Sequence, residues 1–197
     1  MKTIGVLALQ GDFAEHIKIL ESLEVNAVEV RTKNDLDDCS ALIIPGGEST
    51  VIAKLLFSSG LDKEIKVRVK KGMPVYGTCA GAIIAAKKVA ATKGSPEGSE
   101  KQFKPLGLID VEVKRNAYGR QIDSFEAQVK VKGIGEMNCV FIRAPIISKI
   151  GRKVEILAKF EGNPVLAKQG NVLVGTFHPE TEGKTAVHDF FLKMSSG

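Results

Sequence analysis

The fold is decided at residues 74–84, which read Pro74-Val-Tyr-Gly-Thr-Cys79-Ala-Gly81-Ala-Ile-Ile84. An apolar run of strand length leads directly into Gly-Thr-Cys-Ala-Gly and then into a helical pattern. Glycines on both sides of Cys79 permit the tight strand-to-helix turn of a nucleophile elbow, which exposes the central side chain. Cys79 would also stand at a helix N-terminus, where free N–H groups favour a thiolate. The stretch predicts a nucleophilic cysteine, and the alternative is a small buried cysteine that merely enters a helix.

The chain before this turn alternates between strand-like and helix-like patterns. Apolar runs predict strands at 3–9, 27–31, 41–44 and 74–78. Amphipathic patterns predict a helix that begins at Phe13, a second at 49–58 with Ser49 as its N-cap, and others at 63–70 and 80–90. Continuous apolar runs suit strands that are buried on both faces, and the alternation is typical of right-handed βαβ units. The sequence therefore predicts an α/β fold with a doubly wound, mostly parallel (flavodoxin-like) sheet flanked by helices.

The second half of the chain shows a different pattern, in which short strand-like segments alternate with glycine turns. Strands are predicted at 109–113, 127–131, 140–143, 154–160, 165–167 and 172–177. We expect them to add β-hairpins to the sheet before a final helix at 184–194. The polar stretch 92–104 predicts a mobile surface loop. At 197 residues, the whole chain, 1–197, is expected to form a single domain.

Composition limits the classes of function. The three cysteines lie far apart and form no CxxC pair, so neither a disulfide framework nor a redox motif is expected. The net charge is +5, but lysines alternate with acidic residues and Trp is absent, which argues against nucleic-acid binding. The first apolar run is too short for a signal peptide or a membrane span. We therefore expect a cytoplasmic protein that binds neither nucleic acid nor membrane.

A thiolate needs a base, and the sequence holds three histidines. His178 follows the predicted strand 172–177, and Glu180 lies two residues further on, beyond Pro179. Side chains at i and i+2 point the same way in extended backbone, so the carboxylate can orient the imidazole. His16 and His188 fall within predicted helices, where a structural role is expected. His16 is nevertheless near enough to the first turn to reach the carboxyl edge of the sheet.

Two further features have more than one interpretation. Cys79, His178 and Glu180 could ligate a metal, but a structural zinc site needs four ligands and no fourth lies at useful spacing, so no metal is predicted. Residues 45–50, Pro-Gly-Gly-Glu-Ser-Thr, form a glycine turn between a strand and a helix. Its N–H groups could build an oxyanion hole with the N–H of Ala80. A phosphate cradle is the alternative, although the Gly-Lys-Ser/Thr of a Walker loop is missing.

The sequence strongly resembles the class I glutamine amidotransferases, and within them the glutaminase subunits of pyridoxal 5′-phosphate synthase. The Cys79 elbow and the His-Pro-Glu motif at 178–180 mark the superfamily. More specific to the vitamin B6 branch are Arg-Asn-Ala-Tyr-Gly-Arg-Gln at 115–121, Asp-Ser-Phe-Glu at 123–126 and Phe-Ile-Arg-Ala-Pro at 141–145. The resemblance covers almost the whole chain.

The resemblance implies hydrolysis of L-glutamine to L-glutamate and ammonia through a Cys79–His178–Glu180 triad. It implies glutamine binding by Gly47, Glu48, Ser49, Arg115, Ile142 and Arg143, and an oxyanion hole at Gly47 and Ala80. It also implies a hetero-oligomeric complex with the lyase subunit of pyridoxal 5′-phosphate synthase, which receives the ammonia. Family members need no metal or organic cofactor in this subunit, and they stay weakly active until the synthase completes the oxyanion site near Gln10.

Three alternatives remain open at this point. Another ammonia-donating amidotransferase, such as the glutaminase of histidine biosynthesis, would share the triad. A cysteine peptidase or stress-response protein of similar fold should lack the paired His178 and Glu180 and the two arginines. A silent binding module would not need an intact triad. Fold alone does not separate these alternatives.

Overall fold

A computed structural model describes residues 2–90, 104–115 and 124–195. The strands are β1 (Thr3–Leu7), β2 (Asn26–Val30), β3 (Cys39–Ile44), β4 (Val75–Thr78), β5 (Ala86–Ala90), β6 (Ile109–Lys114), β7 (Ser124–Val131), β8 (Gly135–Ile142), β9 (Ile146–Ile150), β10 (Glu155–Phe160), β11 (Asn163–Gln169) and β12 (Val172–Gly175). The helices are α1 (Phe13–Ser22), α2 (Ser49–Ser59), α3 (Leu61–Lys70), α4 (Ala80–Ala85) and α5 (Ala186–Met194), with short 3-10 turns at Asn34–Leu36 and Pro179–Glu182.

The main sheet of the described residues has nine strands in the order β2-β1-β3-β4-β12-β11-β10-β7-β8. The first five strands pair in parallel, in the order expected of a flavodoxin-like fold. The predicted doubly wound α/β architecture is therefore confirmed. Because the parallel strands share one direction, the segments that follow β1, β3, β4 and β12 all emerge at the same edge of the sheet.

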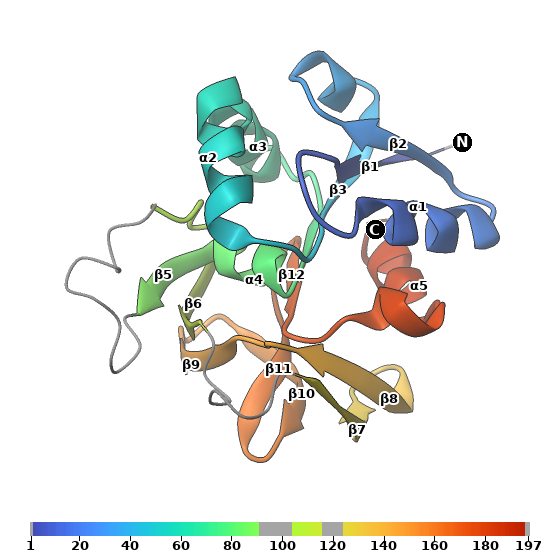
Figure 1. Cartoon of the computed structure of the whole chain (residues 1–197), viewed down its shortest axis with the longest axis vertical. Coiled ribbons are helices and arrows are strands. Elements are labelled where there is room, and N and C mark those ends of the chain that lie inside the picture. Colours follow the sequence, from blue (N-terminus) through green and yellow to red (C-terminus); the bar gives the residue numbers. More distant parts are fainter. Residues whose placement is uncertain (1, 91–103, 116–123, 196–197) are drawn as a thin grey trace.

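Two apolar layers sandwich the parallel strands, because alternate residues of each strand face opposite sides. In β3, Ile43 packs with Leu20 of α1 and Phe191 of α5, whereas Leu42 and Ile44 belong to the opposite layer, with Ile52 of α2. Figure 1 shows α1 and α5 together on one side of these strands and α2 and α3 on the other. Burial on both faces explains why these strands read as continuous apolar runs.

Two hairpins extend the main sheet, in agreement with the β-hairpins that the sequence predicted. The β7–β8 pair and the β10–β11 pair extend the sheet beyond β12. A stack of Phe125, Phe141 and Phe160 joins the two hairpins, with ring centroids 4.7 to 5.6 Å apart. The hairpins lie at the bottom of Figure 1, and β8 ends beside the carboxyl edge of the parallel strands.

The helix predicted at 80–90 is confirmed only for residues 80–85 and is wrong for residues 86–90. Helix α4 ends at Ala85, and residues 86–90 form β5, which pairs in parallel with β6. With β9, these strands make a separate three-stranded sheet, so not every added strand joins the main sheet. Ala- and Lys-rich segments suit a helix by propensity, and here the pairing of Val89 with Val113 overrides that preference. Strand β9 was not predicted at all.

The start of α2 differs from its predicted form. Ser49 is the first helical residue of α2 and not its cap, because the Glu48 side chain accepts the N–H groups of Thr50 and Val51. A carboxylate in this position suits the positive end of the helix dipole. The predicted loop at 92–104 lies outside the described residues except for its last position. Among the described helices, none is both long and apolar enough to span a membrane.

Candidate active site

Cys79 occupies the sharp turn between β4 and α4 that the sequence predicted. Its φ is +46°, a conformation that is strained for a residue with a Cβ. A Cβ on Gly77 would come within 2.6 Å of the Gly81 carbonyl oxygen, and a Cβ on Gly81 would overlap the carbonyl oxygen of Ile44. Both glycines are therefore required by close backbone approach. The turn is held by a 2.8 Å hydrogen bond from the Cys79 N–H to the Gly175 carbonyl.

A cavity of about 430 Å³ opens beside Cys79, a size typical of small-molecule sites. It lies at the carboxyl edge of the parallel strands, where ligands bind in open α/β sheets. Its lining includes every predicted glutamine-binding residue and brings together segments far apart in the chain. The lining residues are Gln10, Asp12, Gly47, Glu48, Ser49, Cys79, Ala80, Ile83, Arg115, Ile142, Arg143 and His178.

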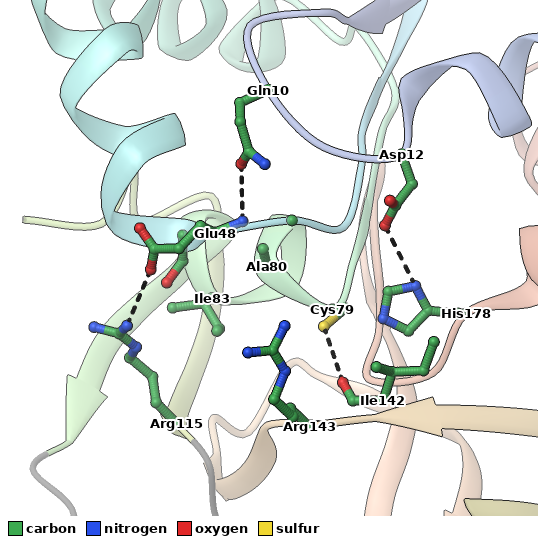
Figure 2. A pocket seen from close by; sticks show the side chains of 12 residues that line it. Gln10, Asp12, Glu48, Cys79, Ala80, Ile83, Arg115, Ile142, Arg143 and His178 are labelled. Atoms are coloured by element: carbon green, nitrogen blue, oxygen red, sulfur yellow. Dashed lines mark hydrogen bonds and ion pairs between the residues drawn. The ribbon is translucent and has the colours of Figure 1, made fainter. Parts of the chain in front are cut away.

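His178 stands next to Cys79 (Figure 2), and Glu180 holds its ring. Its Nδ1 lies 2.6 Å from Oε1 of Glu180, and both side chains are at least 95% buried. The backbone N–H of His178 donates to the Val140 carbonyl of β8 at 2.8 Å, which fixes the start of the segment. Because Glu180 occupies Nδ1, the ring presents Nε2 for chemistry. Nε2 has no hydrogen-bond partner among the described residues.

The surroundings of His178 favour its protonated form. Burial, the largest single influence, lowers the pKa of His178, but the neighbouring Cys79 and Glu180 outweigh it and raise the pKa to about 10. A protonated imidazole beside a cysteine is the arrangement that supports a thiolate. The three side chains named from sequence, a thiol, an imidazole and a carboxylate, therefore meet in space.

Asp12 is a member of this cluster that the sequence interpretation missed. Its Oδ2 lies 3.8 Å from Nδ1 of His178, and Figure 2 shows the carboxylate pointing toward the ring. Asp12, His178 and Glu180 place potential metal-binding atoms within 4.8 Å of one another. The short hydrogen bond from His178 to Glu180 already occupies the nitrogen that such a metal would need. The position of Asp12 directly after the turn that follows β1 was the available signal.

The glycine turn at Gly46 and Gly47 closes another side of the cavity. Asp12 donates its backbone N–H to the Gly46 carbonyl at 3.3 Å, and a Cβ on Gly11 would overlap that carbonyl. The Glu48 N–H donates to Oε1 of Gln10 at 2.8 Å, which ties the turn to the loop after β1. Gly47 has a φ of +139° and so could not readily be replaced.

Charged side chains surround the mouth of the cavity. Arg115 lies 3.4 Å from Oε1 of Glu48, and Arg143 extends into the cavity from the end of β8 (Figure 2). The Ile142 carbonyl oxygen accepts from the Cys79 thiol at 3.9 Å. Arg143 has a positive φ of 43°, which marks the turn that directs it toward the cavity. The structure thus brings both predicted arginines to the same mouth.

The Ala80 N–H belongs to the first residue of α4 and is left unpaired by the helix itself. Both Gly47 and Ala80 line the cavity on which Cys79 opens, as the predicted oxyanion hole requires. His16 and His188 are fully buried, as expected of structural histidines. His16 also reaches the site, because its Nε2 lies 3.6 Å from Oε2 of Glu180.

Comparison with known proteins agrees with this geometry. The profile of the SNO glutamine amidotransferase family matches residues 6–196. The pyridoxal 5′-phosphate synthase subunit PdxT of Dehalococcoides mccartyi (strain CBDB1) is 50% identical over 195 residues, which cover 98% of this chain and 96% of the relative. A PdxT subunit of Thermus thermophilus is 46% identical over 193 residues, with 98% of this chain and 97% of the relative covered.

Solved structures show the same similarity. A crystal structure described as a glutamine amidotransferase superposes with a TM-score of 0.89 at 45% identity, covering 98% of this chain and 99% of that chain. PurLQS from Thermotoga maritima shares the fold alone, with a TM-score of 0.70 at 16% identity. The family profile and the relatives match nearly the full length of the chain, and the elbow and cavity agree with them. The chain therefore belongs to the SNO glutamine amidotransferase family.

Proposed function

We propose that this protein hydrolyses L-glutamine to L-glutamate and ammonia, with Cys79, His178 and Glu180 as its catalytic triad. The observation that carries the proposal is the strained Cys79 elbow facing His178, whose Nδ1 is held by a buried carboxylate at 2.6 Å. A metal-binding or structural cysteine would need neither the elbow nor the oriented ring. Family membership supports glutamine as the substrate.

In the first step, the Cys79 sulfur attacks the side-chain amide carbon of glutamine and forms a C–S bond. The carbonyl oxygen takes up negative charge as the tetrahedral intermediate forms. The backbone N–H groups of Gly47 and Ala80 stabilise that charge from the cavity wall, where donors of fixed position are most effective. The Gly47 turn contributes because the Gln10–Glu48 hydrogen bond holds it in place.

In the second step, His178 donates the Nε2 proton to the amide nitrogen, and ammonia leaves as the C–N bond breaks. His178 then takes a proton from water, which attacks the thioester and releases glutamate and the Cys79 thiolate. Glu180 stabilises the imidazolium and keeps the ring in one orientation throughout. The raised pKa of His178, about 10, keeps the proton available at neutral pH.

We assign glutamine binding to Gly47, Glu48, Ser49, Arg115, Ile142 and Arg143, all of which line the cavity. The substrate carries both an α-carboxylate and an α-ammonium group. A guanidinium binds a carboxylate in a fixed planar geometry, so Arg115 and Arg143 suit the first group. The exposed carboxylate of Glu48, which already contacts Arg115, suits the second group.

The relatives named PdxT are subunits of pyridoxal 5′-phosphate synthase. By analogy we propose that this chain is a single glutaminase domain in a cytoplasmic hetero-oligomer. Its ammonia then passes to the lyase subunit that builds the vitamin B6 cofactor. Binding of the synthase would complete the oxyanion site near Gln10 and raise a low basal activity. No cofactor of this chain's own takes part in these steps.

The test is a glutaminase assay with and without the synthase, on wild type and Cys79→Ala. We expect glutamate release by the wild-type complex and a fall of at least about a thousandfold in the variant. Cys139→Ala is the matched control, because Cys139 is also buried but lies in β8 and does not line the cavity. Full activity of Cys79→Ala, or no glutamate release by the wild-type complex, would refute the proposal.

A further inference from the structure

Two buried histidines lie behind the triad on the side away from the cavity. Oε1 of Glu180 holds His178, while Nε2 of His16 lies 3.6 Å from Oε2 of the same carboxylate. The same Nε2 is 3.3 Å from the Thr78 hydroxyl of β4. On its other side, Nδ1 of His16 lies 2.8 Å from Nε2 of His188 in α5. Glu180 is thus followed by a chain of two imidazoles that comes from two different helices.

The contacts determine where the protons of this chain sit. Nδ1 of His188 has no hydrogen-bond partner among the described residues, so a proton there would be a buried, unpaired donor. His188 therefore carries its proton on Nε2 and donates it to Nδ1 of His16. Since Nδ1 of His16 accepts, its own proton sits on Nε2. Both N–H groups then run in the same direction, toward Thr78 and Glu180.

Burial favours the neutral form of both rings. Burial lowers the pKa of His188 to about 4, and burial followed by the neighbouring His188 and His178 lowers the pKa of His16 well below its ordinary value. Both side chains are fully buried in the layer formed by α1 and α5. A neutral pair costs less to bury than a charged one, and each ring still offers one donor and one acceptor.

We propose that His16, fixed in its tautomer by His188, is a positioning residue that holds the second oxygen of Glu180, so that the first stays aimed at His178. The inference rests on the proposed function, because it concerns the same triad. A buried carboxylate with one unpaired oxygen is free to rotate or to lose its alignment. Oε2 of Glu180 has no hydrogen-bond partner among the described residues, and the N–H of His16, 3.6 Å away, is placed to become that partner and oppose the rotation. Catalytic hydrogen bonds are often long without substrate, and the 3.6 Å contact can shorten on binding.

The alternative is that the histidine pair only fills the core between α1 and α5. The aromatic contacts of His188 with Tyr76 and His16, at ring centroid distances of 6.0 and 5.1 Å, would serve that purpose. If His16 only fills the core, any side chain of similar shape can replace it. If His16 positions Glu180, its replacement must carry a hydrogen-bond donor at the location of Nε2. Substitutions with and without such a donor therefore distinguish the two roles.

The matched substitutions are His16→Gln and His16→Met. Both side chains have the same length, but only Gln carries an amide N–H that can take the place of Nε2. Leu20→Ala, one turn further along α1 and equally buried, is the control for lost packing. The proteins are assayed as the complex with the synthase, and kcat, KM and the pH dependence of kcat are measured. The pKa of the His178 ring is followed by NMR on the chain alone.

We expect His16→Met to lower kcat roughly tenfold, with KM changed less than about twofold. The pKa of His178 and the alkaline limb of the kcat profile should both move to lower pH, because the imidazolium loses part of its support from Glu180. The titratable groups facing Glu180 are His178, His16 and Asp12, with Tyr76 of β4 and His188 behind them. His16→Gln should recover kcat and the His178 pKa, and Leu20→Ala should lower stability without moving either.

Equal kcat in the Met and Gln variants, or an equal loss in Leu20→Ala, would overturn the inference. If His16→Met does not fold, His188→Phe releases the His16 tautomer and should shift the His178 pKa in the same direction; no shift would also overturn it. A wild-type complex without glutaminase activity would remove the proposed function. The NMR titration would still decide whether His16 supports Glu180.

Discussion

Two sides of the cavity differ in their burial and in the contacts that hold them. The inner wall consists of Cys79 and His178, with Glu180 and His16 behind them. These four side chains are 0 to 8% exposed and come from the parallel strands and the segments that cover them. The outer rim consists of Glu48, Arg115 and Arg143 and faces solvent. The Glu48 and Arg115 side chains are 47% and 25% exposed. The buried side contains the 2.6 Å hydrogen bond between His178 and Glu180, whereas the Glu48–Arg115 contact of the rim is a partly exposed ion pair of 3.4 Å.

Under the proposed function, the buried wall and the exposed rim have different tasks. Acid–base chemistry needs fixed geometry and a medium of low dielectric constant, which only the buried wall provides. Recognition of a zwitterion needs opposite charges that can rearrange around a ligand, and exposed ion pairs cost little to break. We therefore expect changes to the wall to act on stability and kcat, and changes to the rim to act on KM.

The largest effect should come from crowding the elbow. In Gly81→Ala the new methyl group would overlap the Ile44 carbonyl of the neighbouring strand, so the turn must shift. We expect a loss of at least about 3 kcal/mol in the free energy of unfolding and almost complete loss of activity. Urea unfolding and the glutaminase assay measure the two quantities.

Gly175→Ala is the control for this substitution. A Cβ at Gly175 meets only side-chain atoms, Leu166 Cδ1 at 3.3 Å and the Tyr76 hydroxyl at 3.4 Å, which can move slightly. Its cost should be clearly smaller than that of Gly81→Ala. Equal costs for the two variants would show that the elbow is no more tightly constrained than the rest of the wall.

The second prediction concerns acid and the buried histidines. The unfolded chain binds a proton at His188 below pH about 6.5, but the folded chain does so only near pH 4. The free energy of unfolding is therefore not reduced by His188 above about pH 6.5. It falls by about 3 kcal/mol in all as the pH decreases from about 6.5 to about 4, because only the unfolded chain takes up the proton in that range. Unfolding free energies of wild type and His188→Phe, measured from pH 7.5 to 4.5, should show a flatter decline in the variant. Parallel declines would mean that His188 is not held neutral.

The smallest effect is expected at the rim. Arg115→Gln or Arg143→Gln should raise KM for glutamine about tenfold and leave kcat within about threefold, because the lost interaction binds the ground state and the transition state equally. Steady-state kinetics of the complex measure both values. Lys54→Gln, an exposed charge on α2 outside the cavity lining, is the control. A fall in kcat with unchanged KM in the arginine variants would contradict the expectation that rim residues act on KM.

Strong local patterns made most of the fold predictable. The parallel strands read as apolar runs because both faces are covered, and the glycines around Cys79 mark the elbow in the sequence alone. Residues 86–90 were mistaken for helix because their composition has no strand signal of its own. Only the pairing with β6, more than twenty residues away in sequence, makes them a strand.

Local sequence by itself determined the residue types of the chemistry and their placement at strand ends. A cysteine between glycines and a histidine two residues before a glutamate are short-range patterns with short-range causes. The tertiary structure alone decided which groups meet. His16 contacts His188 across 172 residues of sequence and Thr78 across 62. Such contacts depend on how helices and strands stack, and no local pattern encodes the stacking. The surroundings that hold Glu180 are therefore visible only in the folded chain.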